Sequence, residues 1–203
     1  MDGKDYILHE DGNYQYFPSV KIWNLLDENY RFYRFLTDVE DVLNTIDDEI
    51  MFLPKIQKLV RKLIVNCYWI QTRFLETDPQ LEGSVLLLYD ELGFPLTVQT
   101  VTFTPGSKSN VHTHGTWGIV AVLKGEEKHQ FWRKSPTSEF VDKIEYVGEV
   151  VLKKGDIISL KSDSIHSVEV VGNVPTLTFN IYGETDPKKR WEFDVQNHTS
   201  RNF

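Results

Sequence analysis

Apolar residues in the first part of the chain recur at the spacing of an α-helix. In residues 38–50, "DVEDVLNTIDDEI", apolar side chains fall three or four positions apart behind an acidic start. Residues 53–75, "LPKIQKLVRKLIVNCYWIQTRFL", repeat this pattern, and Pro54 suits the first turn of a helix. Residues 17–36 are aromatic and partly helical in pattern. The pattern therefore predicts a helical N-terminal region over residues 1–80.

The remaining residues read as short strands separated by turns. Glycines punctuate the runs at the spacing of a closed sandwich or barrel. We therefore expect a mainly β barrel over residues 81–203, with the helices packed on one face or end of it, and a single domain over residues 1–203. The predicted strands are 84–90, 96–104, 110–114, 117–124, 127–133, 139–146, 149–153, 156–160, 166–172, 175–183 and 190–195.

Composition and charge narrow the class of protein. The 203 residues are 40% hydrophobic, which is enough for a core, and the formal net charge of −8 disfavours nucleic acid and anionic membrane as partners. The single cysteine, Cys67, excludes an internal disulfide and a Cys-rich zinc module. The start "MDGKDYILHEDG" shows no signal-peptide pattern, and no apolar run approaches the roughly 20 residues that span a bilayer. We expect a cytoplasmic protein.

Two histidines one residue apart, His112 and His114, precede an apolar run in "NVHTHGTWGIVAVLKGE". Side chains at positions i and i+2 of a strand point to the same side, so two imidazoles could face one metal ion. A His-x-His pair alone is also compatible with ordinary surface or core histidines.

The surroundings of this pair resemble the first motif of the cupins, which are jelly-roll barrels that hold a metal inside. The matching positions are Gly106, the pair His112 and His114, and Gly125. The resemblance implies a cupin double-stranded β-helix, with the N-terminal helices packed on it.

The second cupin motif adds one more histidine after a Gly-Asp turn. Here "KKGDIISLKSDSIHSVEVV" supplies Gly155, Asp156 and His166 at that spacing. The motif usually has proline where Lys161 stands, and also differs at two further positions, Asp163 and Val170.

The first motif normally carries a glutamate ligand as well, at a position held here by Gly118 or Ile119. The ligand set is therefore three neutral imidazoles, which leave the full charge of a divalent ion in place. Such a centre favours an anionic ligand, and a thiol is a candidate because coordination to a metal deprotonates it. Three facial ligands also leave positions open for a second ligand such as dioxygen.

The stretch "HTHGTWGIVAVLKGEE" is similar to the iron-binding motif of the cysteine dioxygenase-like thiol dioxygenases, nearest to the bacterial 3-mercaptopropionate dioxygenase branch. The resemblance extends over roughly residues 80–184. It implies that His112, His114 and His166 bind ferrous iron, and that both atoms of O2 are added to a thiolate sulfur to give a sulfinate.

Members of that family also carry a Ser-x-His-x-Tyr triad on a late strand. The corresponding strand here is "PTLTFNIYGET", with Thr178, Asn180 and Tyr182 at the three positions. Positions i, i+2 and i+4 of a strand share one face, so these three side chains point to the same side. The resemblance implies a catalytic role for them. Asparagine removes the titratable group, and ordinary strand polar residues beside a barrel tyrosine remain the alternative.

Family enzymes hold a substrate carboxylate with an arginine, but the early strand "EGSVLLLYDELG" has no basic residue. Four other cations could take this role: Arg73, Lys128, Arg133 and Arg190. The run that contains Arg190 otherwise reads as a solvated loop.

Several nearby residues admit simpler interpretations. His129 favours a surface or supporting role over ligation, and Glu126 and Glu127 read as solvated charge after a turn. Trp117 suits either the pocket wall or the packed barrel, and Cys67 lies on an apolar helical stripe as a buried thiol.

The sequence thus favours a mononuclear non-haem Fe(II) dioxygenase acting on a small-molecule thiol with O2, as a monomer or homodimer. A tri-histidine cupin dioxygenase that cleaves a carbon–carbon bond of a diketone-like substrate is the second hypothesis. A metal-binding cupin without turnover is the third.

Overall fold

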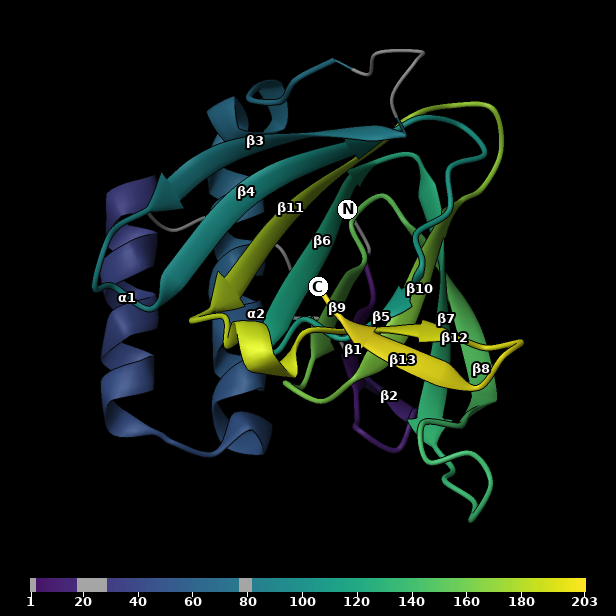
Figure 1. The fold of residues 1–203 in the computed structure, drawn as a ribbon. Coiled ribbons are helices and arrows are strands. Elements are labelled where there is room, and N and C mark those ends of the chain that lie inside the picture. The colour runs from purple at the N-terminus through teal and green to yellow at the C-terminus, as the bar shows by residue number, and fades with distance from the viewer. Residues whose placement is uncertain (1–2, 18–28, 77–81) are drawn as a thin grey trace.

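The computed structural model describes residues 3–17, 29–76 and 82–203. Within them two β-sheets face each other, and two α-helices, α1 (Phe32–Thr45) and α2 (Glu49–Asn66), cover the outer face of the first sheet (Figure 1). The first sheet has the order β2-β1-β9-β6-β11-β4-β3. Its strands are β1 (Asp5–Leu8), β2 (Tyr14–Phe17), β3 (Gly83–Asp90), β4 (Leu96–Phe103), β6 (Gly118–Lys124), β9 (Ile157–Leu160) and β11 (Thr176–Gly183).

The second sheet has the order β13-β12-β5-β10-β7-β8. Two short 3₁₀ helices, Tyr68–Thr72 and Pro187–Lys189, also lie among the described residues. The strands of this sheet are β5 (Val111–His112), β7 (Glu126–Lys134), β8 (Ile144–Lys153), β10 (Ile165–Val170), β12 (Trp191–Asp194) and β13 (Thr199–Asn202).

From β4 to β11 the chain passes back and forth between the two sheets, except that β7 and β8 follow each other in the second sheet. Strands β4, β6, β9 and β11 belong to the first sheet, and β5, β7, β8 and β10 to the second. Neighbours within each set pair antiparallel, for example β11 with β4 and β6, and β10 with β5 and β7. This is the connectivity of an eight-stranded jelly roll, so the predicted fold class, a mainly β cupin barrel with helices packed on it, is confirmed.

The two faces of β11 serve different environments. Leu177, Phe179 and Ile181 are buried against the helices, in one cluster with Phe35 of α1 and residues of α2. Burying one such side chain fully stabilises the fold by about 1.5–3 kcal/mol. The alternate residues of β11 face the inside of the barrel and remain available for a site.

The helix boundaries differ from those predicted. Helix α1 begins at Phe32, before the acidic residues expected to start it, and residues 18–28 of the aromatic segment lie outside the described residues. Helix α2 begins after Asp48, whose carboxylate accepts a hydrogen bond from the Ile50 N–H at 2.9 Å. Pro54 therefore lies inside α2 and not in its first turn, because this cap starts the helix about a turn earlier.

The prediction that residues 1–80 are only helical was wrong at the N-terminus. Strand β1 pairs parallel with β9, and β2 pairs antiparallel with β1, so both extend the first sheet. Residues 5–8 are buried along their whole length, and so short a run shows no period that distinguishes strand from helix. The predicted division near residue 80 is therefore not a boundary between helices and barrel.

Two further strand predictions were wrong. Residues 139–146 and 149–153 were expected as separate strands, but a single strand, β8, continues past Gly148 through a register shift against β7. The C-terminal strand β13 pairs with β12 and was not predicted, since its residues are mostly polar and exposed. Cys67 is buried in the helical core as predicted.

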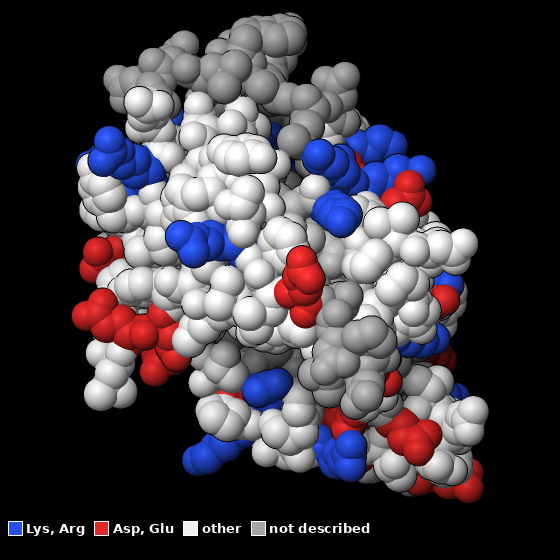
Figure 2. Space-filling view, turned by 90° about the horizontal axis from the view of Figure 1, so that it is seen from above, with Lys and Arg blue, Asp and Glu red and all other residues white. Residues whose placement is uncertain are grey.

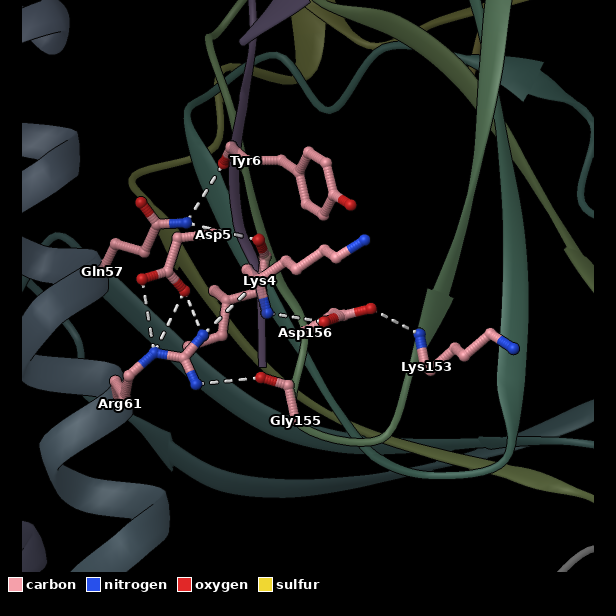
Figure 3. Close-up of polar contacts among 9 residues, drawn as sticks. Lys4, Asp5, Tyr6, Gln57, Arg61, Lys153, Gly155 and Asp156 are labelled. Carbon is pink, nitrogen blue, oxygen red and sulfur yellow. Dashed lines mark hydrogen bonds and ion pairs between the residues drawn. The ribbon is translucent and has the colours of Figure 1, made fainter. Parts of the chain in front are cut away.

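A buried arginine connects α2 to the first sheet (Figure 3). Arg61 is 1% exposed; its Nε donates to Asp5 Oδ1 at 3.0 Å and its Nη1 to the Gly155 carbonyl oxygen at 2.9 Å. One turn earlier, Gln57 donates to the Tyr6 carbonyl oxygen at 3.1 Å. Burial raises the pKa of the Asp5 carboxyl more than Arg61 lowers it, so the pair orients α2 on β1 at a desolvation cost.

The outer surface carries charges of both signs. Seen from above, Lys and Arg side chains lie interspersed with Asp and Glu on a mostly uncharged face (Figure 2). None of the helices in the described part of the chain is long and apolar enough to cross a membrane.

We predict that Arg61→Met lowers the free energy of unfolding by about 3 kcal/mol, because it leaves Asp5 buried without its cation. Urea denaturation measures the change. The matched control is Arg133→Met, which removes an exposed pair with Glu145 and should cost less than about 1 kcal/mol. Equal effects of the two substitutions would contradict the role given to Arg61.

Candidate metal centre

His112 and His114 lie at the end of a two-residue strand, β5. Their rings stand 4.8 Å apart between centroids, so both project to the same side although β5 ends at His112. The intervening Thr113 is buried elsewhere, and its hydroxyl donates to the Lys189 carbonyl oxygen at 2.8 Å. The alternation of an extended segment therefore continues to His114, as the sequence predicted.

The third histidine comes from the neighbouring strand β10. His166 pairs directly with His112 in the antiparallel register, and its ring centroid lies 4.8 Å from that of His112 and 5.0 Å from that of His114. The Nε2 atoms of His114 and His166 are 2.9 Å apart, and one nitrogen of each of the three rings lies within 4.8 Å of the others. The three predicted ligands thus lie together in an arrangement that could hold a metal ion.

The protonation of these rings suits a metal. Burial lowers the pKa of His114 and of His166 well below the ordinary range, and the nearby His112 lowers both further. Burial also lowers the pKa of His112. Metal ligation requires neutral imidazole. Metal–nitrogen bonds of about 2.0–2.1 Å bring two ligand nitrogens to about the 2.9 Å seen between the Nε2 atoms of His114 and His166.

His112 is also held in one orientation by the backbone. Its Nδ1 lies 2.9 Å from the Asn110 carbonyl oxygen, an acceptor, so Nδ1 carries the proton. The lone pair of Nε2 is then free to bind a metal ion. This outer hydrogen bond is of the kind that orients metal-binding histidines in proteins.

Tyr182 stands beside the three histidines. Its ring centroid lies 4.8 Å from that of His114. Thr178 and Asn180 precede it on the inner face of β11, and the Asn180 Nδ2 donates a hydrogen bond to the Thr178 Oγ1 at 3.0 Å. The three residues line the same cavity as the histidines. Among the described residues, none forms a hydrogen bond with the Tyr182 hydroxyl, so the triad is connected only at its Asn180–Thr178 step.

One of the two positions expected for the cupin glutamate, Gly118, lies against this tyrosine. A Cβ placed on Gly118 would lie 2.7 Å from the Cδ1 and Cε1 atoms of Tyr182. Atoms that close require movement, so a glutamate at position 118 and Tyr182 in this place exclude each other.

The cavity inside the barrel has a volume of about 190 Å³, and valines are among its lining residues. A larger hollow of about 600 Å³ lies on the outside against β12 and β13, but it contains none of the three histidines. We therefore place the candidate site in the smaller cavity.

Glu127 and His129 are both more deeply buried than the sequence predicted. Glu127 was expected to be solvated, but it is 1% exposed and lines the cavity. His129 was expected at the surface or in a supporting role; it is fully buried, so the surface alternative is wrong, and its ring stacks on that of His166 at 5.8 Å, outside the group of three histidines. The period of two along β7 places residues 127, 129 and 131 on one face, and it could have indicated that Glu127 and His129 are buried.

Of the four candidate cations, Arg190 lies nearest to the site. Its guanidinium lies 4.4 Å from the ring centroid of Phe203, a ring 6.3 Å from that of His112, and its charge contributes to the lowered pKa of His112 and His114. Arg190 is therefore not simply a solvated loop residue.

The other candidates are engaged elsewhere or are not placed at the site. Lys128 pairs with Glu169 at 2.8 Å and Arg133 pairs with Glu145 at 3.2 Å, while Arg73 is not among the residues that line the cavity. Trp117 packs against Phe52 of α2 at 5.4 Å and belongs to the helical core, not to the cavity wall.

No family model matches the chain. Similar structures include an oxalate oxidase in complex with the substrate analogue glycolate, at 19% identity and a TM-score of 0.43 over 57% of this chain and 58% of that chain. A cupin superfamily protein from Desulfitobacterium hafniense matches at 13% identity and a TM-score of 0.43, over 54% of this chain and 84% of that chain.

A third similar structure is an uncharacterised conserved protein with a double-stranded β-helix domain from Klebsiella pneumoniae, at 15% identity and a TM-score of 0.43, over 58% of this chain and 88% of that chain. The strand order of this chain is itself that of a double-stranded β-helix. The chain spans less than two thirds of the length of the oxalate oxidases that it resembles, and these identities assign no activity to it.

We predict that His166→Ala abolishes metal retention. Loss of an outer partner of a metal ligand already costs about 10–100-fold in affinity, so loss of the ligand should cost more than about 100-fold. Metal analysis of protein purified without chelators measures the content. His198→Asn is the control, because His198 lies on the β12–β13 hairpin at φ 53°, which asparagine also tolerates. Full metal content in His166→Ala would show that the three-histidine assignment is wrong.

Proposed function

We propose that this chain is a mononuclear non-haem Fe(II) dioxygenase that oxidises a small-molecule thiol to a sulfinate with O2. The observation that carries the proposal is the ligand set: three neutral imidazoles and no carboxylate, beside a half-buried tyrosine in a cavity inside the barrel. Imidazole also binds other divalent metals, so iron itself is part of the proposal.

The charge of the site supports an anionic ligand. His112, His114 and His166 contribute no negative charge, so a divalent ion held by them keeps its full charge and favours a thiolate over a thiol. The Arg190 guanidinium adds positive charge on the side of His112. An anionic substrate with a metal-binding sulfur fits both features.

The reaction balances without another reductant. A thiolate and O2 give a sulfinate, R–S⁻ + O2 → R–SO2⁻, in which two S–O bonds form, the O–O bond breaks, and the sulfur supplies every electron that the oxygen accepts. When bound, ferrous iron would supply adjacent open positions for the thiolate and for dioxygen. The contribution of the protein is to hold the metal, to orient the thiol and to keep water out of a small cavity.

Tyr182 is suited to orient a ligand in that cavity. Burial raises the pKa of its hydroxyl, the Glu127 charge raises it further, and Arg190 opposes both effects. Its hydroxyl therefore keeps its proton near neutral pH and can donate a hydrogen bond to a bound substrate. Asn180 and Thr178 extend this polar face inward along β11, and we propose that all three residues act in the reaction as positioning or proton-donating groups.

Oxygen consumption by the Fe(II)-loaded protein tests the function. We expect uptake with members of a panel of small thiols and none with a panel of β-diketones, together with iron in the purified protein. Uptake only with diketones would favour the carbon–carbon-cleaving alternative. Iron without uptake on either panel would favour a binding module without turnover.

Replacing Asn180 with histidine tests the altered triad. Asn180→His adds a titratable group next to Tyr182, and burial at this position lowers the pKa of an imidazole from its ordinary value of about 6.5, so the pH profile of the rate should gain an inflection below that pH. Initial rates between pH 5 and pH 9 measure it, with metal content and Tm confirming an intact site. An unchanged profile and rate would make the asparagine irrelevant to the chemistry.

A further inference from the structure

Thr113 lies between two of the metal-binding candidates and is buried, with 4% of its surface exposed. It is not among the residues that line the cavity. Its hydroxyl donates a hydrogen bond to the Lys189 carbonyl oxygen at 2.8 Å and accepts one from the Trp191 N–H at 3.0 Å. One hydroxyl group thus acts as donor and acceptor at once, and it joins the residue between the histidines to the residues on both sides of Arg190.

The backbones of these two segments are also in contact. We call residues 112–115 the ligand loop and residues 186–191 the basic turn. The Asp186 N–H donates to the Gly115 carbonyl oxygen at 3.3 Å. A Cβ on Gly115, whose φ is 69°, would lie 2.6 Å from the Asp186 carbonyl oxygen, so this close approach requires glycine. The ligand loop and the basic turn therefore pack directly against each other.

Strand β5 ends before the second histidine of the pair. Its last residue is His112, and the register with β10 and β12 pairs no residue of this strand beyond it. The contacts that continue past this end are those of Thr113, whose N–H donates to the Trp191 carbonyl oxygen at 2.9 Å and whose hydroxyl holds the basic turn. Because the direction of a side chain follows from its backbone, the direction of the His114 ring depends on these contacts.

The basic turn is held on another side by the end of β13. The Asn202 Nδ2 donates to the carbonyl oxygens of Pro187 and Arg190, each at 2.7 Å. Both hydrogen bonds end on the basic turn, and neither involves the ligand loop. Thr113 and Asn202 thus anchor the same turn, but only Thr113 belongs to the segment that carries the histidines.

We infer that Thr113 is a positioning residue of the metal centre, whose hydroxyl fixes the His114 ring relative to the His112 ring by tying the ligand loop to the basic turn. The inference rests on the proposed function in one respect, that the three histidines hold a metal ion. Ligands that are held in place before the metal arrives lose less conformational freedom on binding, so they bind it more tightly. A loosened ligand loop should therefore bind the metal more weakly.

Binding of Co(II) to the metal-free protein tests this role. Imidazole sites bind Co(II), and its visible absorption bands change with the arrangement of its ligands. Thr113→Val keeps the shape of the side chain and removes its hydroxyl. We expect changed Co(II) bands and a Kd about 10–100-fold higher, as when outer contacts of metal ligands are removed. Competition with a chelator gives each Kd.

Thr113→Ser tests whether the hydroxyl is responsible. It keeps the hydroxyl and removes only a methyl group, so it should restore the wild-type Kd and Co(II) bands. A wild-type Kd and spectrum in Thr113→Val would overturn the inference, and so would a Thr113→Ser variant that binds Co(II) as weakly as Thr113→Val. Thr113→Ala, which adds no bulk, gives the same comparison if Thr113→Val does not fold.

Asn202→Ala is the matched control, because it removes two hydrogen bonds from the same basic turn. We expect Asn202→Ala and Thr113→Val both to lower the Tm of the metal-free protein, but only Thr113→Val to change the Kd and the Co(II) bands. Equal losses of metal affinity would show that any loosening of the turn has this effect, and the role given to Thr113 would be wrong.

These measurements use the metal alone, without thiol or O2, so they separate this inference from the proposed function. If the wild-type protein takes up no oxygen with any thiol while the Kd values follow the expected pattern, the thiol reaction is wrong and the role of Thr113 stands. If oxygen uptake is present and Thr113→Val binds Co(II) like the wild-type protein, the role of Thr113 is wrong and the reaction stands. A wild-type protein that binds no Co(II) would overturn the inference together with the metal site.

Discussion

The site depends on the pairing of β5 with β10. Directly opposed residues of an antiparallel pair have Cβ atoms about 4.5–5.5 Å apart, so the register that sets His166 opposite His112 brings their imidazoles together. Strand β5 is only two residues long, and β12 pairs with it on the other side, with Glu192 opposite His112. Because a strand so short has few ladder bonds of its own, its position is determined by the two strands that flank it.

The barrel interior is shaped by side chains that exclude one another. Gly118 leaves room for the Tyr182 ring, and that ring fills the place where a fourth, carboxylate ligand would begin. The loss of a negative ligand and the gain of a phenol hydroxyl beside the metal-binding candidates thus follow from one packing relation. Without a carboxylate ligand, a divalent ion held by the three histidines would keep its full charge and favour an anionic ligand.

The cavity is electrically asymmetric. Arg190 lies on the side of His112 and the C-terminal strands, and Glu127 lies on β7, with valines among the cavity's lining residues. Such an arrangement orients a dipolar ligand better than a uniformly charged one. The Arg61 network belongs to a different part of the molecule and holds α2 against β1 and the turn at Gly155, away from the cavity lining.

Local patterns in the sequence determined the period of most strands, the helical stripes, and the choice of His112, His114 and His166 as candidate ligands, because these depend on spacing along the chain. Only the tertiary structure decided that β1 and β2 join the first sheet, that Glu127 is buried, and that Arg190 lies nearest the site. Each of these depends on contacts between residues far apart in the chain, such as Thr176 with Glu127. A pattern of hydrophobic and polar positions does not contain such contacts, since burial of a polar side chain is set by its partners and not by its neighbours in sequence.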